Sequence, residues 1–593
     1  MPSMINQDIS HLFKQMAIFL EMMDVPFKPA AYEKAAGEIE ALDRDLRDIY
    51  QEGGLKALNA VPTVGESMAE KIEEFIKIGQ IKELERLKKK FPVEVEELYR
   101  VEGLGPKTIK LLWQKLRIKN LHDLEAAAKA GKIAVIPHLG EKTEQNILRG
   151  LEFLRQTGNR KILGYILPLA RQIEERFRKL PGVSHAVIAG SLRRRQETIG
   201  DIDLLVTTTK PKMAQETFVK MPEVIAVYAE GVGRSSVRLN NGMDADIRIL
   251  PPESFGAALQ YFTGDKQHNI ELRKIAIQKG FKLSEYGLFR GRRRLAGKTE
   301  EEIYKKLGMD WMPPELRTAS GEIAAAIKHT LPTLLPYGAV RGDLQVQTNW
   351  TDGAASLEKM TEAAMTAGLD YIAITDHTKT LAMTGGLDEK GLARQGKAID
   401  KINAQIAAGK FGGEKSGAKS AGRKNFRVLK SAEVNILKDG SLDIQNSALK
   451  KLDVVSAAVH TNFKMRREEM TKRIIKALQN PYLNILFHPT GRLINQRPPY
   501  EIDIDAVIVA AKKNNVALEL DCFPDRTDLK DEHVRKAVDA GVKIVIDTDA
   551  HSPDHLRYIE LGEATARRGW AVEKDVLNAL PLPKLLAYFR KKR

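Results

Sequence analysis

The feature that most constrains this chain is the segment Gly190–Val206, which reads GSLRRRQETIGDIDLLV. Its apolar end predicts a strand, and on a strand the side chains of residues i and i+2 point to the same face. Asp201 and Asp203 therefore point together, and two carboxylates at close range need cations between them. Gly190 and Ser191 supply a tight turn whose backbone amides can face an anion. A metal site beside a phosphate site is the minimum requirement for nucleotidyl transfer.

A third carboxylate from a neighbouring strand normally completes a pair of catalytic metal sites. The segment Met243–Leu250 (MDADIRIL) offers two, because Asp244 and Asp246 would share one face of a strand. Spacing alone does not choose between them. Metal ions about 3.5–4 Å apart would bridge such carboxylates. The expected chemistry is then positioning and neutralisation of charge, as in phosphoryl transfer generally.

The length and the net charge of the chain indicate a multidomain protein with an acidic partner. A chain of 593 residues is too long for one core, so several domains are expected. Lys and Arg number 94 against 78 Asp and Glu, and the resulting charge of +16 suggests an acidic partner, most simply nucleic acid. Some of this charge lies in Gly409–Lys424, a Gly/Lys/Ser-rich stretch that predicts a disordered basic loop.

Cysteine content and hydropathy give further limits. The one cysteine, Cys522, excludes an internal disulfide and a thiolate zinc cluster. The sequence shows no signal peptide and no apolar run of about 18 residues. We therefore expect a cytoplasmic protein with no membrane partner.

Residues 1–160 predict one helix after another. Three segments combine a hydrophobic residue, a turn and a glycine before a polar helix: Val61–Gly65, Val101–Gly105 and Ile136–Gly140. They resemble helix-hairpin-helix motifs, in which backbone amides at a helix N-terminus approach a DNA phosphate without reading bases. Thr63 and His138 stand where the first glycine of the motif is usual. The candidate DNA-binding residues are Gly65, Gly103, Gly105, Lys107 and Gly140.

A lysine follows the first of these segments. Lys71 lies on the helix after the hairpin, and a partly desolvated lysine near phosphate can form a Schiff base with the sugar of an abasic site. The alternative is a solvated lysine that only contacts phosphate.

The last third of the chain alternates strands with helices. This alternation predicts a parallel, barrel-like sheet whose ligands gather at the carboxyl ends of the strands. The predicted strands are Ile372–Thr375, Val454–Ala458, Leu483–Phe487, Ala517–Leu520 and Ile544–Asp547. His, Asp or Glu residues follow these strands, and imidazole and carboxylate ligands suit Zn, Mn or Fe.

Residues 1–320 resemble a family X DNA polymerase of the polymerase-beta type. The resemblance rests on Gly190–Leu205, Asp246-Ile247-Arg248, Tyr261-Phe262-Thr263-Gly264 and Lys279-Gly280-Phe281. It implies Asp246 rather than Asp244 as the third ligand of two Mg²⁺ ions, beside Asp201 and Asp203. It also implies that Tyr261 and Phe262 lie against the sugar of the incoming nucleotide and disfavour a ribose. The other implied nucleotide-binding residues are Arg160, Gly190, Ser191, Arg194, Gly200 and Asn269, the last at the minor-groove edge.

The same resemblance bears on Lys71, which falls at the position of the family's lyase nucleophile. Ser67 and Gln80, however, stand where better-studied members have phosphate-binding lysines. We therefore expect 5′-deoxyribose-phosphate lyase activity to be weak or absent.

Residues 338–575 resemble the polymerase-and-histidinol-phosphatase (PHP) domain, a trinuclear metal phosphoesterase fold. The family has His-x-His in its first strand, whereas this chain has Gln345 and Gln347. Glutamine is a far weaker ligand than imidazole, so we expect one metal position to bind poorly and nuclease activity to be impaired. A structural domain with vestigial ligands is the alternative. The implied ligands are Asp352, His377, Glu433, His460, His488, Asp549 and His551.

Together these parts resemble the bacterial and archaeal PolX architecture. The expected fold is multidomain: helical hairpin domains (1–90 and 91–155), an α+β nucleotidyltransferase palm (156–255), a thumb (256–318), a linker (319–337) and a (β/α) barrel-like PHP domain (338–593). The expected function is template-dependent filling of short gaps in base-excision repair, with 3′–5′ exonuclease or phosphoesterase activity. Gapped or primer–template DNA and deoxynucleoside triphosphates are the expected partners of a monomer.

Two other functions compete with this one. A repair nuclease or phosphoesterase could use its polymerase half mainly to bind DNA. A nucleotidyltransferase could instead act on RNA or a small molecule. The hairpin repeats argue against the second, because a small-molecule enzyme needs no modules that follow a nucleic-acid backbone.

Overall fold

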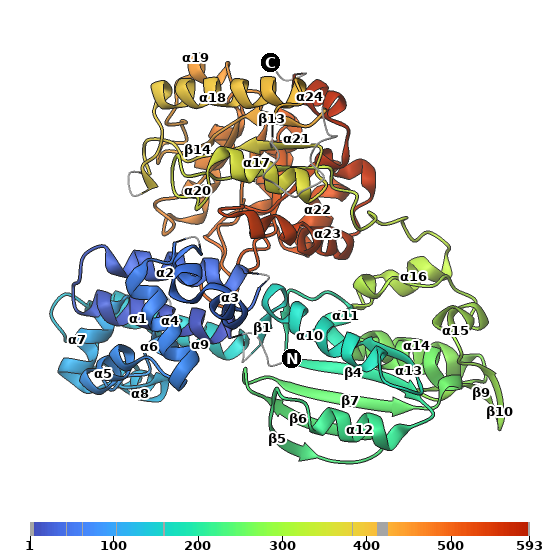
Figure 1. The fold of residues 1–593 in the computed structure, drawn as a ribbon. Helices are drawn as coiled ribbons and strands as arrows, with labels where there is room; N and C mark the ends of the chain where they lie inside the picture. Colours follow the sequence, from blue (N-terminus) through green and yellow to red (C-terminus); the bar gives the residue numbers. More distant parts are fainter. Residues whose placement is uncertain are drawn as a thin grey trace.

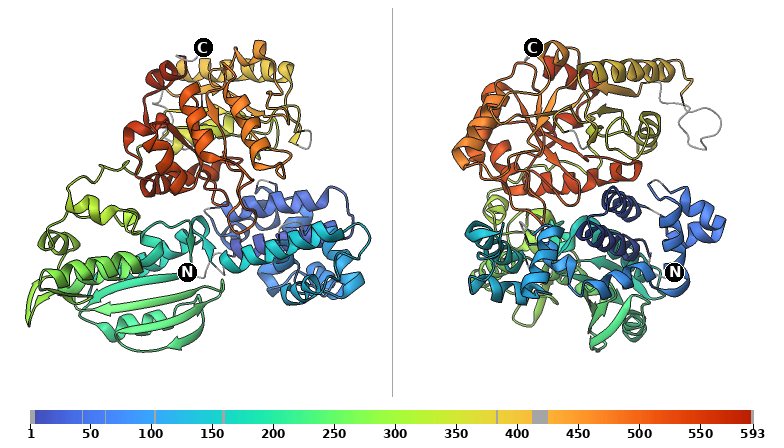
Figure 2. Two further views of the ribbon diagram at one scale, coloured as in Figure 1. Left: turned by 180° about the vertical axis from the view of Figure 1, so that it is seen from behind. Right: turned by 90° about the vertical axis from the view of Figure 1, so that its left-hand side faces the viewer.

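The computed structural model describes residues 5–590 except 43, 62, 102–103, 158–159, 382–383 and 412–424. Four bodies follow one another along the chain (Figure 1): N-terminal helices, a central sheet with its helices, a smaller body, and a C-terminal α/β body that lies against the first two. The views from behind and from the side show the same arrangement (Figure 2). Among the described helices, none is long and apolar enough to cross a membrane. Most of the predicted basic loop, Gly409–Lys424, lies outside the described residues.

The N-terminal body is helical, as the sequence predicts. Its amphipathic helices share one core, in which the rings of Phe19, Phe91 and Trp113 pack in series. The helices are α1 (Asn6–Met22), α2 (Lys28–Ala41), α3 (Leu46–Asn59), α4 (Glu66–Ile78), α5 (Lys82–Lys90), α6 (Val95–Tyr99), α7 (Pro106–Leu116), α8 (Leu121–Lys129) and α9 (Gly140–Thr157).

The central body is a five-stranded sheet in the order β2-β4-β7-β6-β5. Strands β4 and β7 are parallel, and every other pair in this sheet is antiparallel. The strands are β2 (Val183–Ile188), β4 (Asp201–Thr208), β5 (Val224–Ala229), β6 (Arg234–Leu239) and β7 (Asp244–Leu250). Helices α10 (Leu163–Arg178) and α12 (Pro211–Val219) share a core with it, and β1 (Lys161–Ile162) pairs with β3 (Thr198–Ile199).

Alternation along β4 decides which face carries the carboxylates. Ile202, Leu204 and Val206 are buried in the core shared with α10 and α12. Because neighbouring side chains on a strand point to opposite faces, Asp201 and Asp203 project from the other face. The apolar residues of β4 thus fix the direction of its acidic residues.

A smaller body follows the sheet and ends in the expected connector. Residues 319–337 are not a bare tether, because α16 (Glu322–Ile327) packs Ile323 and Ala326 into the core of this body. The buried Glu322 carboxylate also lies 2.7 Å from His268 Nδ1. The other elements are α13 (Phe255–Thr263), α14 (Lys266–Gln278), α15 (Glu300–Lys306), and the antiparallel strands β8 (Lys282–Ser284), β9 (Gly287–Arg290) and β10 (Arg293–Ala296).

The C-terminal body has two parallel sheets, β11-β12-β13 and β14-β15-β16-β17-β18. A bridge between His377 and Glu433 joins them at one side, and a bridge between Val346 and Ala550 joins them at the other, which gives a barrel-like ring. The strands are β11 (Gly342–Val346), β12 (Tyr371–Ile374), β13 (Arg427–Lys430), β14 (Glu433–Asn435), β15 (Ser456–Ala458), β16 (Ile485–Leu486), β17 (Ala517–Asp521) and β18 (Ile544–Asp547). The helices are α17 (Leu357–Thr366), α18 (Glu389–Ala407), α19 (Asn446–Leu449), α20 (Arg467–Leu478), α21 (Ile504–Asn514), α22 (Asp531–Asp539), α23 (Ile559–Arg568) and α24 (Leu582–Arg590).

Candidate active sites

Three carboxylates meet on the open face of the central sheet. Asp203 on β4 lies opposite Asp246 on β7, and Asp201 lies opposite Asp244. One oxygen from each of Asp201, Asp203 and Asp246 lies within 4.8 Å of the others. Burial, with the neighbouring negative charges, raises the pKa of Asp203 to about 7 and also raises that of Asp201. Such mutual repulsion suits a site that binds divalent cations.

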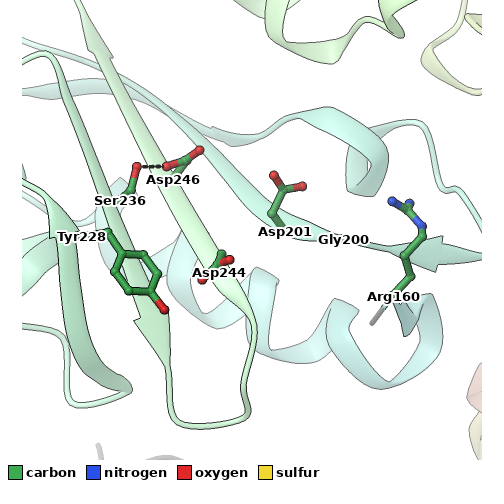
Figure 3. Close-up of a pocket in the computed structure, with 7 residues that line it drawn as sticks. All are labelled: Arg160, Gly200, Asp201, Tyr228, Ser236, Asp244 and Asp246. Atoms are coloured by element: carbon green, nitrogen blue, oxygen red, sulfur yellow. Dashed lines mark hydrogen bonds between the residues drawn. The ribbon is translucent and has the colours of Figure 1, made fainter. Parts of the chain in front are cut away.

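The two aspartates of β7 have different partners. Asp244 forms an ion pair with Arg238, whose Nε lies 2.8 Å from Asp244 Oδ1. Asp246 instead accepts a hydrogen bond from the Ser236 hydroxyl. Figure 3 shows this bond, with Asp246 between Ser236 and Asp201 in the view. The geometry therefore groups Asp246 with the β4 pair, and its ion pair with Arg234, at 3.9 Å, is longer than that of Asp244 with Arg238. Sequence reasoning missed Ser236 and Arg238, because their roles depend on the pairing of β6 with β7.

The predicted Gly190–Ser191 turn is the start of a short helix, α11 (Gly190–Arg193), and it lies directly against the carboxylates. Gly190 has φ +56°, and a Cβ built on it would lie 2.0 Å from Asp203 Oδ2. No side chain fits there, so glycine allows the carboxylate to approach the turn. The Ser191 hydroxyl is buried, and within the described residues it has no hydrogen-bond partner. A buried hydroxyl with an unused donor suits a ligand oxygen.

The three consecutive arginines after this turn serve three different parts of the molecule. Arg193 binds Glu300 of α15, with both contacts at 2.8 Å. Arg194 donates to the last backbone carbonyl of α13, and burial lowers its pKa. Arg195 lies 3.2 Å from Glu560 of the C-terminal body. The three arginines therefore do not form one basic patch, and the charge of Arg194 acts on Asp203.

Arg160 and Gly200 line an open pocket beside the carboxylates (Figure 3). The Arg160 side chain is held by Thr198, with Nε 3.0 Å from Thr198 Oγ1. A Cβ on Gly200 would lie 3.0 Å from Arg160 Nη1, so glycine leaves room for the guanidinium. Tyr228 also lines this pocket, and no motif predicted it.

Tyr261 and Phe262 lie in the last turn of α13, with their rings edge to face and centroids 5.1 Å apart. The guanidinium of Arg248 lies 5.2 Å from the Phe262 ring centroid. Asn269 donates through Nδ2 to the Tyr261 carbonyl at 2.7 Å, and its Oδ1 accepts from Gln260 at 2.8 Å. In this structure the Asn269 amide therefore fixes the end of α13.

The hairpin turns have the backbone that the motif requires. Thr63 and His138 have φ +65° and +73°, the left-handed region that glycine adopts most easily. This explains why glycine is usual at these positions. Gly65 and Gly105 cap the N-termini of α4 and α7, and Gly140 begins α9. Gly103 lies outside the described residues.

Two lysines of the N-terminal body are already paired. Lys107 Nζ lies 3.1 Å from Asp24 Oδ1, an exposed pair that a phosphate could displace because solvent screens it. Lys71 Nζ lies 2.9 Å from Glu83 Oε2 and 3.0 Å from Ser67 Oγ. Burial opposes the charge on Lys71, but Glu83 and Tyr32 outweigh it and raise its pKa. A lyase nucleophile needs the neutral amine, so this environment disfavours that role.

The C-terminal body gathers the expected metal ligands at the carboxyl ends of its strands. One cluster joins Asp352, His377 and His551, and a second joins His377, Glu433 and His460. His460 Nε2 and His488 Nε2 lie 2.8 and 2.9 Å from the same oxygen, Glu433 Oε1. Both clusters combine imidazole and carboxylate, which fits divalent metal ions.

The remaining ligand position is different. Gln347 Nε2 donates to Glu433 Oε2 at 2.9 Å. Both amide atoms of Gln345 are buried without a hydrogen-bond partner among the described residues. Asp549 belongs to neither cluster and lies 3.5 Å from Arg526 Nε. Sequence reasoning missed Arg526, because no motif marks it.

Comparison with known proteins decides the family. The chain is 35% identical over 590 residues to a protein of Bacillus subtilis (strain 168) named DNA polymerase/3′-5′ exonuclease PolX, with 99% of both chains covered. The chain belongs to the PolX family. This identifies the architecture of the whole chain rather than of one body.

Partial matches agree with membership of the PolX family. The family described as DNA polymerase beta thumb matches residues 258–318. The family described as Helix-hairpin-helix domain matches residues 4–81, and the one described as SAM-like Helix-hairpin-helix tandem matches residues 55–117 and 95–152. DNA polymerase lambda of Arabidopsis thaliana is 24% identical over 356 residues, which is 53% of this chain and 63% of that protein. A probable phosphatase of Thermoanaerobacter sp. (strain X514) is 32% identical over 180 residues, which is 29% of this chain and 71% of that protein. The predicted fold class and the helix-hairpin-helix prediction are confirmed.

Proposed function

We propose that this chain fills short gaps in DNA during repair by template-dependent, two-metal nucleotidyl transfer from deoxynucleoside triphosphates. One observation carries the proposal: Asp201, Asp203 and Asp246 lie within 4.8 Å of one another beside the Gly190–Ser191 turn. Membership of the PolX family and the hairpin turns support DNA as the partner.

The residues of the central body have distinct tasks in this proposal. Asp201, Asp203 and Asp246 hold two divalent cations, for which Mg²⁺ is proposed. Bound there, such ions supply charge neutralisation and lower the pKa of a primer 3′-hydroxyl. The Ser191 hydroxyl and the Arg194 guanidinium bind and orient the triphosphate, the first through its unused donor.

Other residues align the substrates. Arg160 lies across Gly200 and faces the same pocket, where it adds positive charge. Tyr261 and Phe262 exclude the 2′-hydroxyl of a ribonucleotide by occupying the space beside the sugar. The hairpins, with Gly65 and Gly105 at helix N-termini, hold the backbone on either side of the gap. Holding both reactants in one geometry supplies much of the rate acceleration.

The decisive experiment compares Asp246→Asn with Asp244→Asn. The two residues are two positions apart on β7, yet only Asp246 belongs to the carboxylate cluster. We expect Asp246→Asn to abolish extension on DNA with a one-nucleotide gap, measured with and without a 5′-phosphate, and Asp244→Asn to retain it. Extension by Asp246→Asn at the wild-type rate would refute the assignment.

A second activity is favoured by the two His-carboxylate clusters of the C-terminal body. We propose that they hold Mn²⁺, Zn²⁺ or Fe and support 3′–5′ exonuclease or phosphoesterase activity, reduced by Gln345 and Gln347. Asp201→Ala and His488→Ala should each abolish one activity and leave the other. If Asp201→Ala left gap repair intact while His488→Ala destroyed it, the chain would be a nuclease that uses its other half mainly to bind DNA.

Weak lyase activity at Lys71, a monomeric state and a cytoplasmic location stay predictions. The Lys71–Glu83 ion pair supports the prediction of weak lyase activity, because an amine held protonated by a carboxylate is a poor nucleophile.

A further inference from the structure

A partly buried arginine lies among the carboxylates of the C-terminal site. Arg526 follows β17, and its Nε lies 3.2 Å from Asp521 Oδ2 and 3.5 Å from Asp549 Oδ2. The negative charge of Glu433 acts on it as well, and together these charges raise its pKa. A guanidinium keeps its proton under all ordinary conditions, so the site contains a permanent cation.

The neutral amides lie beside the same carboxylate. Backbone hydrogen bonds join Gln345 and Gln347 to Ala550, which places the end of β11 beside Asp549. Gln347 turns an N–H toward Glu433, and Gln345 has no partner for either amide atom among the described residues. An N–H donor is the opposite of a metal ligand, because it presents positive rather than negative charge.

We infer that the Arg526 guanidinium replaces one of the metal ions of this centre, so the site holds two ions and one fixed cation instead of three ions. The two His-containing clusters share His377 and include neither Gln345 nor Gln347, so they remain for the two ions. At the third position Asp549 pairs with arginine, and the glutamines replace ligands that are no longer needed.

The arginine is held in place by the central body. Tyr165 of α10 donates to Asp525 Oδ2 at 3.0 Å. A Cβ on Gly164 would lie 2.8 Å from Pro524 Cγ, so α10 approaches this loop closely. Arg526 N also donates to the Phe523 carbonyl at 2.9 Å. A cation fixed in this way is preorganised and does not depend on metal supply.

The chemical role of Arg526 follows from its remaining surface. Its side chain keeps 23% of its surface exposed, so a phosphate group can reach it. Guanidinium binds phosphate oxygens through paired N–H donors. In the proposed phosphodiester hydrolysis, Arg526 binds the substrate phosphate. This binding role rests on the proposed function. The replacement of the ion does not.

The test counts ions and needs no nuclease assay. The full chain, in an Asp246→Asn background that weakens the other metal site, is loaded with Mn²⁺, desalted and analysed for metal by mass spectrometry. We expect two ions per chain. We also expect two in Gln345→His/Gln347→His, because Arg526 still occupies the third position, and three when Arg526→Met is added to these changes.

The controls separate this idea from loss of folding. Arg535→Met removes an exposed arginine that pairs with Asp539 at 2.8 Å, and in the double-histidine background it should leave two ions. Thermal melting of each variant checks the fold. Three ions in the starting chain, or three ions in Gln345→His/Gln347→His, would overturn the inference. Neither result depends on whether the triple variant folds. A folded triple variant with two ions would also overturn it.

Discussion

Replacing Gly190 by alanine should disable nucleotidyl transfer without unfolding the protein. The added Cβ would lie 2.0 Å from Asp203 Oδ2, whereas real Cβ contacts are essentially never shorter than 3.0 Å. The Asp203 carboxylate must therefore move by about 1 Å or more. It cannot move freely, because it is buried between the turn and β7.

The magnitude follows from two separate costs. Alanine at φ +56° costs roughly 1–2 kcal/mol of strain, a fraction of the roughly 5–15 kcal/mol that stabilises a typical domain. A misplacement of about 1 Å at a reacting centre can lower the rate by about 100-fold. We therefore expect kcat for extension to fall at least 100-fold, with a decrease in Tm of a few degrees.

The assay is single-nucleotide extension on gapped DNA, with Gly242→Ala as the matched control. Gly242 precedes β7 with φ +78°, and a Cβ there would meet nothing within 4 Å. It carries the same kind of strain without the clash, so it should lower Tm similarly and leave kcat unchanged. Equal kcat values for Gly190→Ala and the wild type would show that Asp203 does not need its present position.

Three further outcomes can be measured. Ser191→Ala should raise the KM for the triphosphate roughly 10–100-fold, because a hydrogen bond to a charged group contributes about 1.5–3 kcal/mol; an unchanged KM contradicts the assignment. Lys71→Met should leave extension unchanged, since this lysine pairs with Glu83, and borohydride trapping on an incised abasic site should show little adduct even in the wild type. Burial raises the pKa of Glu38, beside Ser552, to about 7. The folded state then favours the protonated acid, so the free energy of unfolding decreases as pH rises from about 4.5 to 7, by up to ~3 kcal/mol. Glu38→Gln should reduce the difference in unfolding free energy between pH 5 and pH 8, measured by denaturant melts. An equal difference in the variant and the wild type would contradict this role of Glu38.

Local patterns predicted much of the central site. The alternation of apolar and acidic residues along β4 determines the direction of Asp201 and Asp203, and this rule needs no partner strand. The choice between Asp244 and Asp246 depends on β6, which supplies Arg238 to one and Ser236 to the other. Such partners depend on which strands are neighbours in the sheet, and the spacing of residues within one strand does not predict the neighbours.

Long-range contacts were the least predictable. Arg526 forms its ion pairs through a loop that has no motif, and α10, far away in the sequence, fixes that loop. Gln345 and Gln347 predicted a weakened metal position, but the sequence pattern did not indicate that Arg526 lies beside it. Only the folded barrel brings the compensating charge next to Asp549.

The run of Arg193, Arg194 and Arg195 makes the triphosphate turn a mechanical junction. A shift of the thumb pulls on the turn through Glu300, and a shift of the C-terminal body pulls on the next-but-one residue through Glu560. Arg194 lies between these two anchors in the sequence, so its two neighbours connect it to both bodies. We therefore expect the position of Arg194 to depend on how the thumb and the C-terminal body are placed.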